Sequence, residues 1–245
     1  MAHDNRTIGH DFFQQTKYRR SRMPGGYLDW QRKPRPYKEY PDAERISLPT
    51  ELPYLDLGLW DIVRLRRSAR EFTSTPITLQ QLAALLWASQ GVTQQTPHFE
   101  LRAAPSAGAL YPIETYIAVN TVDSLKKGLY HYNVREHALE PLRSGQITEP
   151  LARACLDQDW MMFANVIFIW TAMFERCTWK YRQRAYRYIS LDAGHIAHAV
   201  ALAAVALDMD SCPIAAFYDE EVNALVQIDG EQESALYLTA VGRLD

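Results

Sequence analysis

The segment YRYISLDAGHIAHAVALAAVALDM, residues 186–209, constrains the fold more than any other part of the sequence. It is alanine-rich and apolar almost all round, so it predicts a helix buried on most sides by close neighbours. The run ANVIFIWTA, residues 164–172, is apolar along the length of a strand and predicts a central strand covered on both faces. Both elements need a full core, which 245 residues can bury as one domain, alone or with an appendage.

Shorter patterns supply the elements around this core. Residues 57–65 carry a mixed apolar face that is typical of a helix. In ITLQQLAALLWASQGV, Thr78 and Gln81 form a capping box at the start of a helix that ends at Gly91. Strands are predicted at IETYIAVN, GLYHYN and ALYLTAVG, and Asp219 opens a short helix. The mixture predicts an α+β fold in which helices sandwich a small, mainly antiparallel central sheet.

The first fifty residues differ from the rest. They are rich in Pro, Arg, Lys and aromatic residues and show no clean period, which predicts an extended N-terminal arm. A disordered tail normally lacks so many aromatics, so we expect a strap packed across the domain or across a partner subunit. The arginines and lysines of the arm are interpreted as a solvated face. We therefore divide the chain into an arm, residues 1–50, and a domain, residues 51–245.

Composition argues against several classes of protein. A formal net charge of -3 disfavours a dedicated nucleic-acid binder. There is no run of about 18 apolar residues and no secretory signal, so we expect neither a membrane span nor export. Three scattered cysteines without a C-x-x-C pair predict a reducing cytoplasm. His195 and His198 stand at helical spacing without further ligands, so we expect them on a polar or ligand-facing side of the helix and no metal site.

Three basic segments are candidates for chemistry. The segment RRSAR contains Arg66, Arg67, Ser68 and Arg70, which suit a bidentate anion site or, alternatively, a charged helix end paired with acids. Arg243 closes a predicted central strand and matters only if the fold brings it near the first segment.

The third basic segment contains the neighbours Lys180 and Tyr181, which can donate or accept a proton when their surroundings lower their pKa values. Glycine-rich nucleotide loops and a G-x-S-x-G elbow are absent from the sequence. The chain therefore offers arginines for a phosphate but no protein nucleophile, which suits a cofactor that carries its own chemistry.

Several motifs in fixed order resemble a known family. They are RRSAREF, LLWASQGV, APSAGALYPIETYIAV, GLYHYN, KYRQRAYRYISLDAGHIAHAVALAAVALDMDSCPIAAF and ALYLTAVGR, spread from Arg66 to Arg243. Together they resemble the SagB-type dehydrogenase branch of the nitroreductase superfamily, and TIGHDFFQQTK and PYKEYP resemble the leader of stand-alone members. The resemblance implies a nitroreductase-like fold and an FMN-binding homodimer with active sites at the subunit interface.

The resemblance also implies roles for individual residues. Arg66, Arg67, Ser68 and Arg70, from the RRSAR motif, would bind FMN, with Arg243 helping at the phosphate and Arg70 near the pyrimidine ring. The loop that the partner presents to the flavin would consist of Pro105, Ser106, Ala107 and Gly108, and the segment beside flavin N5 of Pro213, Ile214, Ala215 and Ala216. Lys180 and Tyr181 match a catalytic pair.

The sequence departs from the family pattern in two places: family members usually carry glycines near Asp208 and Asp210, and Ala215 stands where glycine is common. An aspartate tolerates a left-handed helix cap less well than glycine, and a methyl group at Ala215 could crowd the ring.

The expected function is two-electron hydride transfer between a small or peptide-derived substrate and flavin N5 by an FMN-dependent oxidoreductase. A second hypothesis is a reductase of nitroaromatics or quinones with NAD(P)H as electron donor. A third is a flavin-binding partner subunit without turnover, which uses the arm for docking. The expected partners are a second copy of the chain and a small-molecule or peptide-derived substrate, with no nucleic acid and no membrane; the third hypothesis adds a modifying complex in which the chain would be a subunit.

Overall fold

The structure, a computed structural model, describes residues 7–23, 27–96 and 99–244. Its helices are α1 (Ile8–Gln15), α2 (Leu59–Leu65), α3 (Leu79–Gln90), α4 (Thr148–Ala154), α5 (Phe174–Tyr181), α6 (Ala185–Ala206) and α7 (Asp219–Val226). Its strands are β1 (Ile46–Ser47), β2 (Val92–Gln95), β3 (Glu100–Arg102), β4 (Ile113–Val119), β5 (Gly128–Asn133), β6 (Ala138–Ser144), β7 (Val166–Met173), β8 (Asp210–Ile214) and β9 (Glu233–Gly242). Short 3-10 turns are η1 (Arg20–Arg22), η2 (Trp30–Arg32), η3 (Ala107–Ala109), η4 (Asp159–Phe163) and η5 (Arg182–Arg184).

A seven-stranded sheet with the order β1-β6-β5-β4-β7-β9-β8 forms the centre of the molecule, and each neighbouring pair is antiparallel. The strands β2 and β3 form a separate hairpin. The predicted α+β class is confirmed. The sheet is larger than the small one expected, because β1, β6 and β8 carry weak strand signals.

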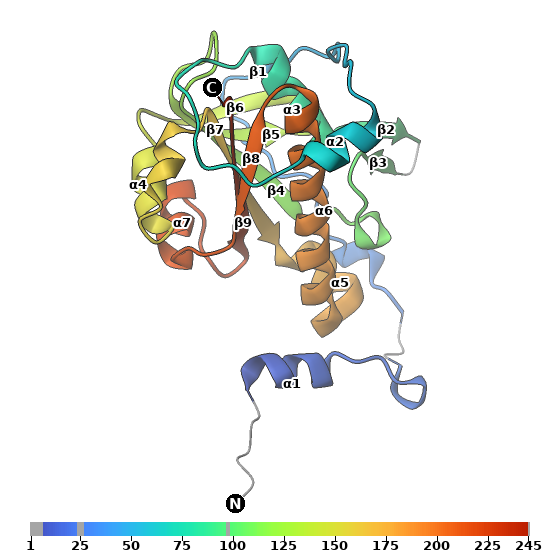
Figure 1. Cartoon of the computed structure of the whole chain (residues 1–245). Helices are drawn as coiled ribbons and strands as arrows, with labels where there is room; N and C mark the ends of the chain where they lie inside the picture. Colours follow the sequence, from blue (N-terminus) through green and yellow to red (C-terminus); the bar gives the residue numbers. More distant parts are fainter. Residues whose placement is uncertain (1–6, 24–26, 97–98, 245) are drawn as a thin grey trace, which may run out of the picture.

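The central strand β7 has both faces buried, as its apolar run predicts. Phe168 and Trp170 pack into one core with α3 and α6, whereas Ile167 and Ile169 pack into a second core with α4 and α7. Figure 1 shows these helix pairs on opposite sides of the sheet. The alternation of a strand's side chains thus turns one apolar run into the wall between two cores.

The expected capping box at the start of α3 is present. The side chain of Thr78 accepts a hydrogen bond from the backbone N–H of Gln81, and the Gln81 side chain accepts one from the Thr78 N–H. Helix α6, which runs for 22 residues, confirms the long buried helix. It ends before Asp208, whose φ of 59° is the left-handed cap suggested by the sequence.

The described part of the arm is not extended throughout, because residues 8–15 form helix α1. This helix lies beyond the end of α5 in Figure 1 and has no buried residues. Arg187 connects it to α6 by donating hydrogen bonds to the Phe13 carbonyl and to Thr16 Oγ1. Further along, the arm joins the sheet where β1 pairs with β6.

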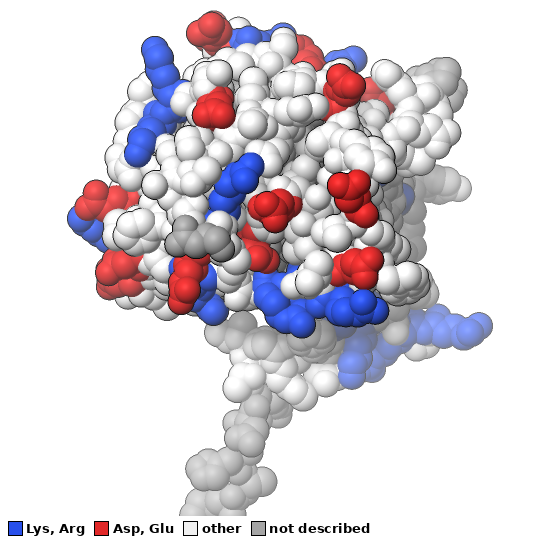
Figure 2. Space-filling model, turned by 45° about the horizontal axis from the view of Figure 1, so that its top comes forward, with Lys and Arg blue, Asp and Glu red and all other residues white. Residues whose placement is uncertain are grey.

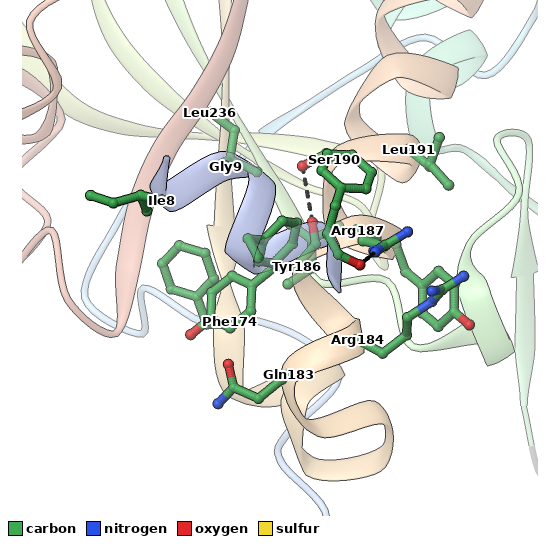
Figure 3. A pocket seen from close by; sticks show the side chains of 14 residues that line it. Ile8, Gly9, Phe174, Gln183, Arg184, Tyr186, Arg187, Ser190, Leu191 and Leu236 are labelled. Atoms are coloured by element: carbon green, nitrogen blue, oxygen red, sulfur yellow. Dashed lines mark hydrogen bonds between the residues drawn. The ribbon is translucent and has the colours of Figure 1, made fainter. Parts of the chain in front are cut away.

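An apolar cavity of about 870 Å³ lies between α1 and the start of α6 (Figure 3). Aromatic side chains dominate its wall, among them Phe12, Phe13, Phe174 and Tyr186. None of the residues predicted to bind a cofactor or to act in catalysis lines it. Its size therefore does not make it the first candidate for the active site.

The surface charge and the longest helical stretch indicate whether the protein could bind a polyanion or cross a membrane. On the face shown in Figure 2, acidic and basic residues are interspersed over most of the surface, and basic side chains gather along its lower edge. In the described residues, the stretch Phe174–Ala206 is long and apolar enough to cross a membrane, but half of the tested window is buried inside the protein. A core helix passes the same test.

Candidate functional site

The RRSAR segment lies along the outer edge of β8. Arg66 caps the end of α2, and the segment continues beside the strand, where Ser68 forms a parallel bridge with Ser211. The Ala69 N–H donates to the Ser211 carbonyl at 3.1 Å. Thr73 N–H then donates to the carbonyl of Arg243 at 2.9 Å. The backbone of Arg243 therefore lies beside Thr73, three residues after the RRSAR segment, and Arg243 lines one cavity with Leu65, the residue before Arg66. This is the proximity that the sequence left open.

A cavity of about 430 Å³ opens at this place between the ends of α2 and α6, the start of β8 and the chain's last residues. Asp210 and Arg243 both line it. Burial raises the pKa of Asp210, and the positive charge of Arg66 opposes that shift, so Arg66 is close to the same cavity. We call Arg66, Ser68, Asp210 and Arg243 the arginine cluster.

The arginine cluster fits an anionic group. Arg243 Nη2 donates to Gln81 Oε1 at 3.5 Å, but its buried Nε has no hydrogen-bond partner among the described residues. Buried donors are rarely left unpaired, so an oxyanion here would satisfy a group that the protein does not. Asp210 opposes such an anion when it is ionised.

Two arginines of the same motif have other contacts. Arg67 Nη1 donates to the carbonyls of Arg64 and Arg66 at 2.8 and 2.7 Å and so caps the open end of α2. The guanidinium carbon of Arg70 lies 5.7 Å from the centre of the Trp160 ring. Burial raises the pKa of Cys212, and nearby Arg70 opposes this shift, which puts Arg70 beside β8.

The segment Pro213–Ala216 continues β8 away from the arginine cluster. Pro213 pairs with Thr239 of β9, and the Ile214 side chain is buried in the core beneath. Ala215 and Ala216 are exposed after the strand ends. A flat ligand beside this edge would therefore meet backbone and small side chains.

The loop Pro105–Gly108 lies against the first half of α6. Ser106 Oγ donates to Asp192 Oδ2 at 2.6 Å, and the Ala107 N–H donates to Asp192 Oδ1 at 3.3 Å. Ser106 Oγ also accepts from the Tyr111 N–H at 2.9 Å. Burial raises the pKa of Asp192, although the hydrogen bonds from Ser106 and Ala107 favour its charged form. The buried aspartate thus fixes the conformation of the loop.

Gly108 meets the predicted catalytic pair. Its φ of +67° is a left-handed conformation, and a Cβ atom built on it would lie 2.5 Å from Tyr181 Oη and 2.9 Å from Lys180 Nζ. Both side chains come from the last turn of α5, and the Tyr181 ring centre lies 4.9 Å from that of Tyr188. We call Gly108, Lys180, Tyr181 and Asp192 the lysine–tyrosine cluster.

A buried ion pair between α5 and β4 lies next to this cluster. Arg176, one helical turn before Lys180, lies 2.5 Å from Glu114 of β4. Arg176 Nη1 also donates to the Tyr111 carbonyl at 3.3 Å, which ties α5 to the loop. Burial alone would raise the pKa of Glu114, but Arg176 and His131 hold it well below its usual range. The sequence analysis missed this pair and Asp192; a lone acid within an apolar strand was the available signal for Glu114.

The two clusters lie at opposite ends of α6. Asp192 belongs to the first half of the helix, whereas the arginine cluster lies beyond its end at Ala206. A rise of about 1.5 Å per residue separates these points by about 21 Å along the axis. The predicted residues are therefore brought into two groups within one chain.

The structure places the two histidines that the sequence analysis singled out on the surface of α6. Both His195 and His198 are exposed on α6. Over the described ranges, no group of three or more His, Cys, Asp and Glu side chains could hold a metal ion.

Comparison with known proteins gives a consistent result. The chain matches the nitroreductase family over residues 63–243. It is 35% identical over 202 residues to MJ1384 of Methanocaldococcus jannaschii, which carries a nitroreductase name, and the match covers 82% of this chain and 98% of that protein. It is 33% identical over 147 residues to the trifolitoxin-processing protein TfxB of Rhizobium leguminosarum bv. trifolii, covering 58% of this chain.

A solved structure from Anabaena variabilis, also named as a nitroreductase, superposes with a TM-score of 0.77 at 32% identity and covers 96% of this chain. The match spans less than half of two of these relatives, 39% of TfxB and 46% of the Anabaena chain.

Proposed function

The chain belongs to the nitroreductase family, in its SagB-type branch, and from this premise we propose that it is an FMN-dependent dehydrogenase. Its substrate would be small or peptide-derived. The observation that carries the proposal is the division of the chemistry-bearing residues into two clusters at opposite ends of α6. This division supports a homodimer in which the arginine cluster of one chain and the lysine–tyrosine cluster of its partner face the same cofactor.

The arginine cluster would hold the phosphate of FMN. Arg66 and Arg243 supply fork-shaped donors, and the unpaired Nε of Arg243 fits an oxyanion. Ser68 adds a hydroxyl, and Arg70 beside β8 would serve the pyrimidine end of the ring. Pro213–Ala216 would line the ring edge, where small residues leave backbone groups accessible. Arg67 is the least suited of these residues, because its guanidinium is engaged by carbonyls at the end of α2.

Bound FMN supplies a two-electron acceptor, and the chain's own residues manage the proton. In its deprotonated form, Lys180 Nζ or Tyr181 Oη would accept a proton from one substrate atom, while the hydride from the neighbouring atom would be taken up by the cofactor. Both atoms lie against Gly108, so the loop Pro105–Gly108 limits how far the pair can move. Asp192 and Arg176 keep the loop and α5 in fixed contact, which is the kind of support that a proton-transfer site needs.

The relatives named as nitroreductases favour a second candidate, an NAD(P)H-dependent reductase of nitroaromatics or quinones. The two candidates differ in the source of electrons. The visible spectrum of the purified protein, mixed anaerobically with NADH or NADPH, separates them. Rapid bleaching of flavin bands supports the reductase, and bands that stay oxidised support the dehydrogenase. A protein that shows no flavin bands after addition of FMN contradicts both.

Mixed dimers test the composite site directly. One variant carries Lys180→Ala and Tyr181→Phe, and the other carries Arg66→Ala and Arg243→Ala. Each alone should be inactive, but random mixing by co-expression should restore about a quarter of the wild-type turnover, because half the dimers are mixed and each has one intact site. Mixing that restores nothing, with mixed dimers shown by mass, contradicts the shared site.

We also place the protein in a reducing cytoplasm. Cys155, Cys177 and Cys212 are free and buried, and burial raises the pKa of the first two thiols to about 12. Such thiols are unreactive.

A further inference from the structure

A second, polar cavity lies beside Ala109, the residue that follows Gly108 of the lysine–tyrosine cluster. It has a volume of about 280 Å³ and lies between the arm, the β2–β3 hairpin and the residues that follow Gly108. Ala109 and Tyr111 form the side that it shares with the loop. Its basic lining residues are Lys33, Arg102 and Arg135.

Arg102 is a buried guanidinium without an ion-pair partner. Only 7% of the residue is exposed, and within the described part of the chain no carboxylate lies within ion-pair distance of it. Its Nη1 donates to Gln90 Oε1 at 2.8 Å, but its buried Nε has no hydrogen-bond partner among the described residues. The nearby acid Glu114 is already engaged by Arg176 and His131. A buried charge in this state is costly unless an anion joins it.

Aromatic rings hold the guanidinium of Arg102 in place. Its carbon lies 4.5 Å from the centre of the Tyr111 ring and 5.1 Å from that of Tyr37. The guanidinium carbon of Arg135 lies 5.8 Å from the Tyr37 ring on the same cavity. Two arginine forks beside a shared ring suit a planar anion with an apolar body.

The charges of the lining favour an anion as well. Against the three cations stands Glu100, which accepts hydrogen bonds from Tyr37 Oη and from Gln95 Nε2. The lining therefore keeps an excess of positive charge, which concentrates anions in the cavity. The volume is near the lower end for ligand pockets and suits a ring with one acidic group better than a peptide.

We propose that this cavity binds the carboxylate of a small acid, held by Arg102 and Arg135. The assignment of that acid as the substrate rests on the proposed function. Ala109 lines the cavity and directly follows Gly108, which lies against Lys180 and Tyr181, so the cavity and the proton-transfer pair share one loop. The arm contributes Tyr37 to the cavity and so takes part in substrate recognition.

Benzoate is a suitable probe, and benzamide is its neutral counterpart. Calorimetry on the full-length protein, with and without FMN, should show that benzoate binds and that benzamide binds at least tenfold more weakly. Arg135→Gln should weaken benzoate about tenfold, whereas Arg153→Gln, an exposed arginine of α4, should change the Kd less than twofold. Because Arg102→Met could unfold the protein, Arg102→Lys, which keeps the charge but loses the fork, is the second variant.

Three results would overturn the proposal. They are equal binding of benzoate and benzamide, a benzoate Kd that neither Arg135→Gln nor Arg102→Lys changes, and tighter binding of inorganic phosphate than of benzoate. Arginine-dependent binding in a protein that never takes up FMN would support the carboxylate site while the flavin function fails. The two failures are therefore distinguishable.

Discussion

Substitution of Gly108 by alanine tests whether the close contact of the loop Pro105–Gly108 with Lys180 and Tyr181 matters for catalysis. Gly108 adopts φ +67°, where an L side chain costs about 1–2 kcal/mol. An added methyl group would also stand 2.5 Å from Tyr181 Oη and 2.9 Å from Lys180 Nζ. Ordinary contact begins near 3.4 Å, so the hydroxyl must retreat by about 1 Å and the amine by about half as much.

The backbone strain and the displacement of the Lys180 and Tyr181 side chains should affect different measurements. Because the colliding atoms are ends of flexible side chains, Gly108→Ala should lower the free energy of unfolding by only the ~1–2 kcal/mol of backbone strain. A displacement of about 1 Å at a reacting group can cost about 100-fold in rate, so turnover should fall by that order. Gly145→Ala is the control: Gly145 also has a positive φ, +106°, but nothing lies within 4 Å of its Cβ position. It should lose stability and keep its turnover.

Urea unfolding measures the first effect, and steady-state turnover of FMN-loaded protein measures the second. Labelling of Lys180 by an acylating reagent, followed by mass spectrometry, reports displacement of the amine without relying on activity. If Gly108→Ala matches Gly145→Ala in turnover and Lys180 keeps its wild-type labelling rate, the contact between the loop and the pair has no catalytic importance.

Two further predictions concern charge. Asp210→Asn should tighten FMN about tenfold in a fluorescence titration, or ~1.4 kcal/mol, because Asp210 lines the same cavity as Arg243 and its ionised carboxylate would repel a phosphate there; unchanged or weaker binding would contradict the phosphate assignment. Burial lowers the pKa of His131, but Glu114 and Glu140 outweigh it and raise the value above normal. The free energy of unfolding should therefore fall as pH rises from about 6.5 through that raised pKa, and His131→Gln should flatten the curve; a rise over the same pH range in urea titrations would refute this.

The sequence predicted those helices and strands that are determined by interactions within a few neighbouring residues. The capping box of Thr78 and Gln81 acts within one turn, so the start of α3 follows directly from the sequence. The apolar run of β7 likewise specifies burial on both faces without reference to its partners. In contrast, β1 is only two residues long and exists because it pairs with β6, far along the chain.

The candidate site was predictable in its residue types but not in its supports. The RRSAR segment places three arginines within five residues, and the KY segment places a lysine beside a tyrosine. Both groupings are visible in the sequence without knowledge of the fold. The partners that orient them are separated by long stretches of chain: Arg176 pairs with Glu114, and Asp192 binds Ser106. A lone acid in an apolar strand indicates that a buried cation exists, but only the fold identifies which one.

The conformation of Gly108 gives the small-residue loop a second reason to be small. The family resemblance implies that this loop faces the flavin, where short side chains would leave room for a flat ring. In the structure, Lys180 and Tyr181 already occupy the space that a side chain at residue 108 would need. A plain turn would not require glycine to meet an amine and a phenol at this distance. The loop is therefore matched to the last turn of α5, and Asp192 and Arg176 maintain that match from α6 and from within α5.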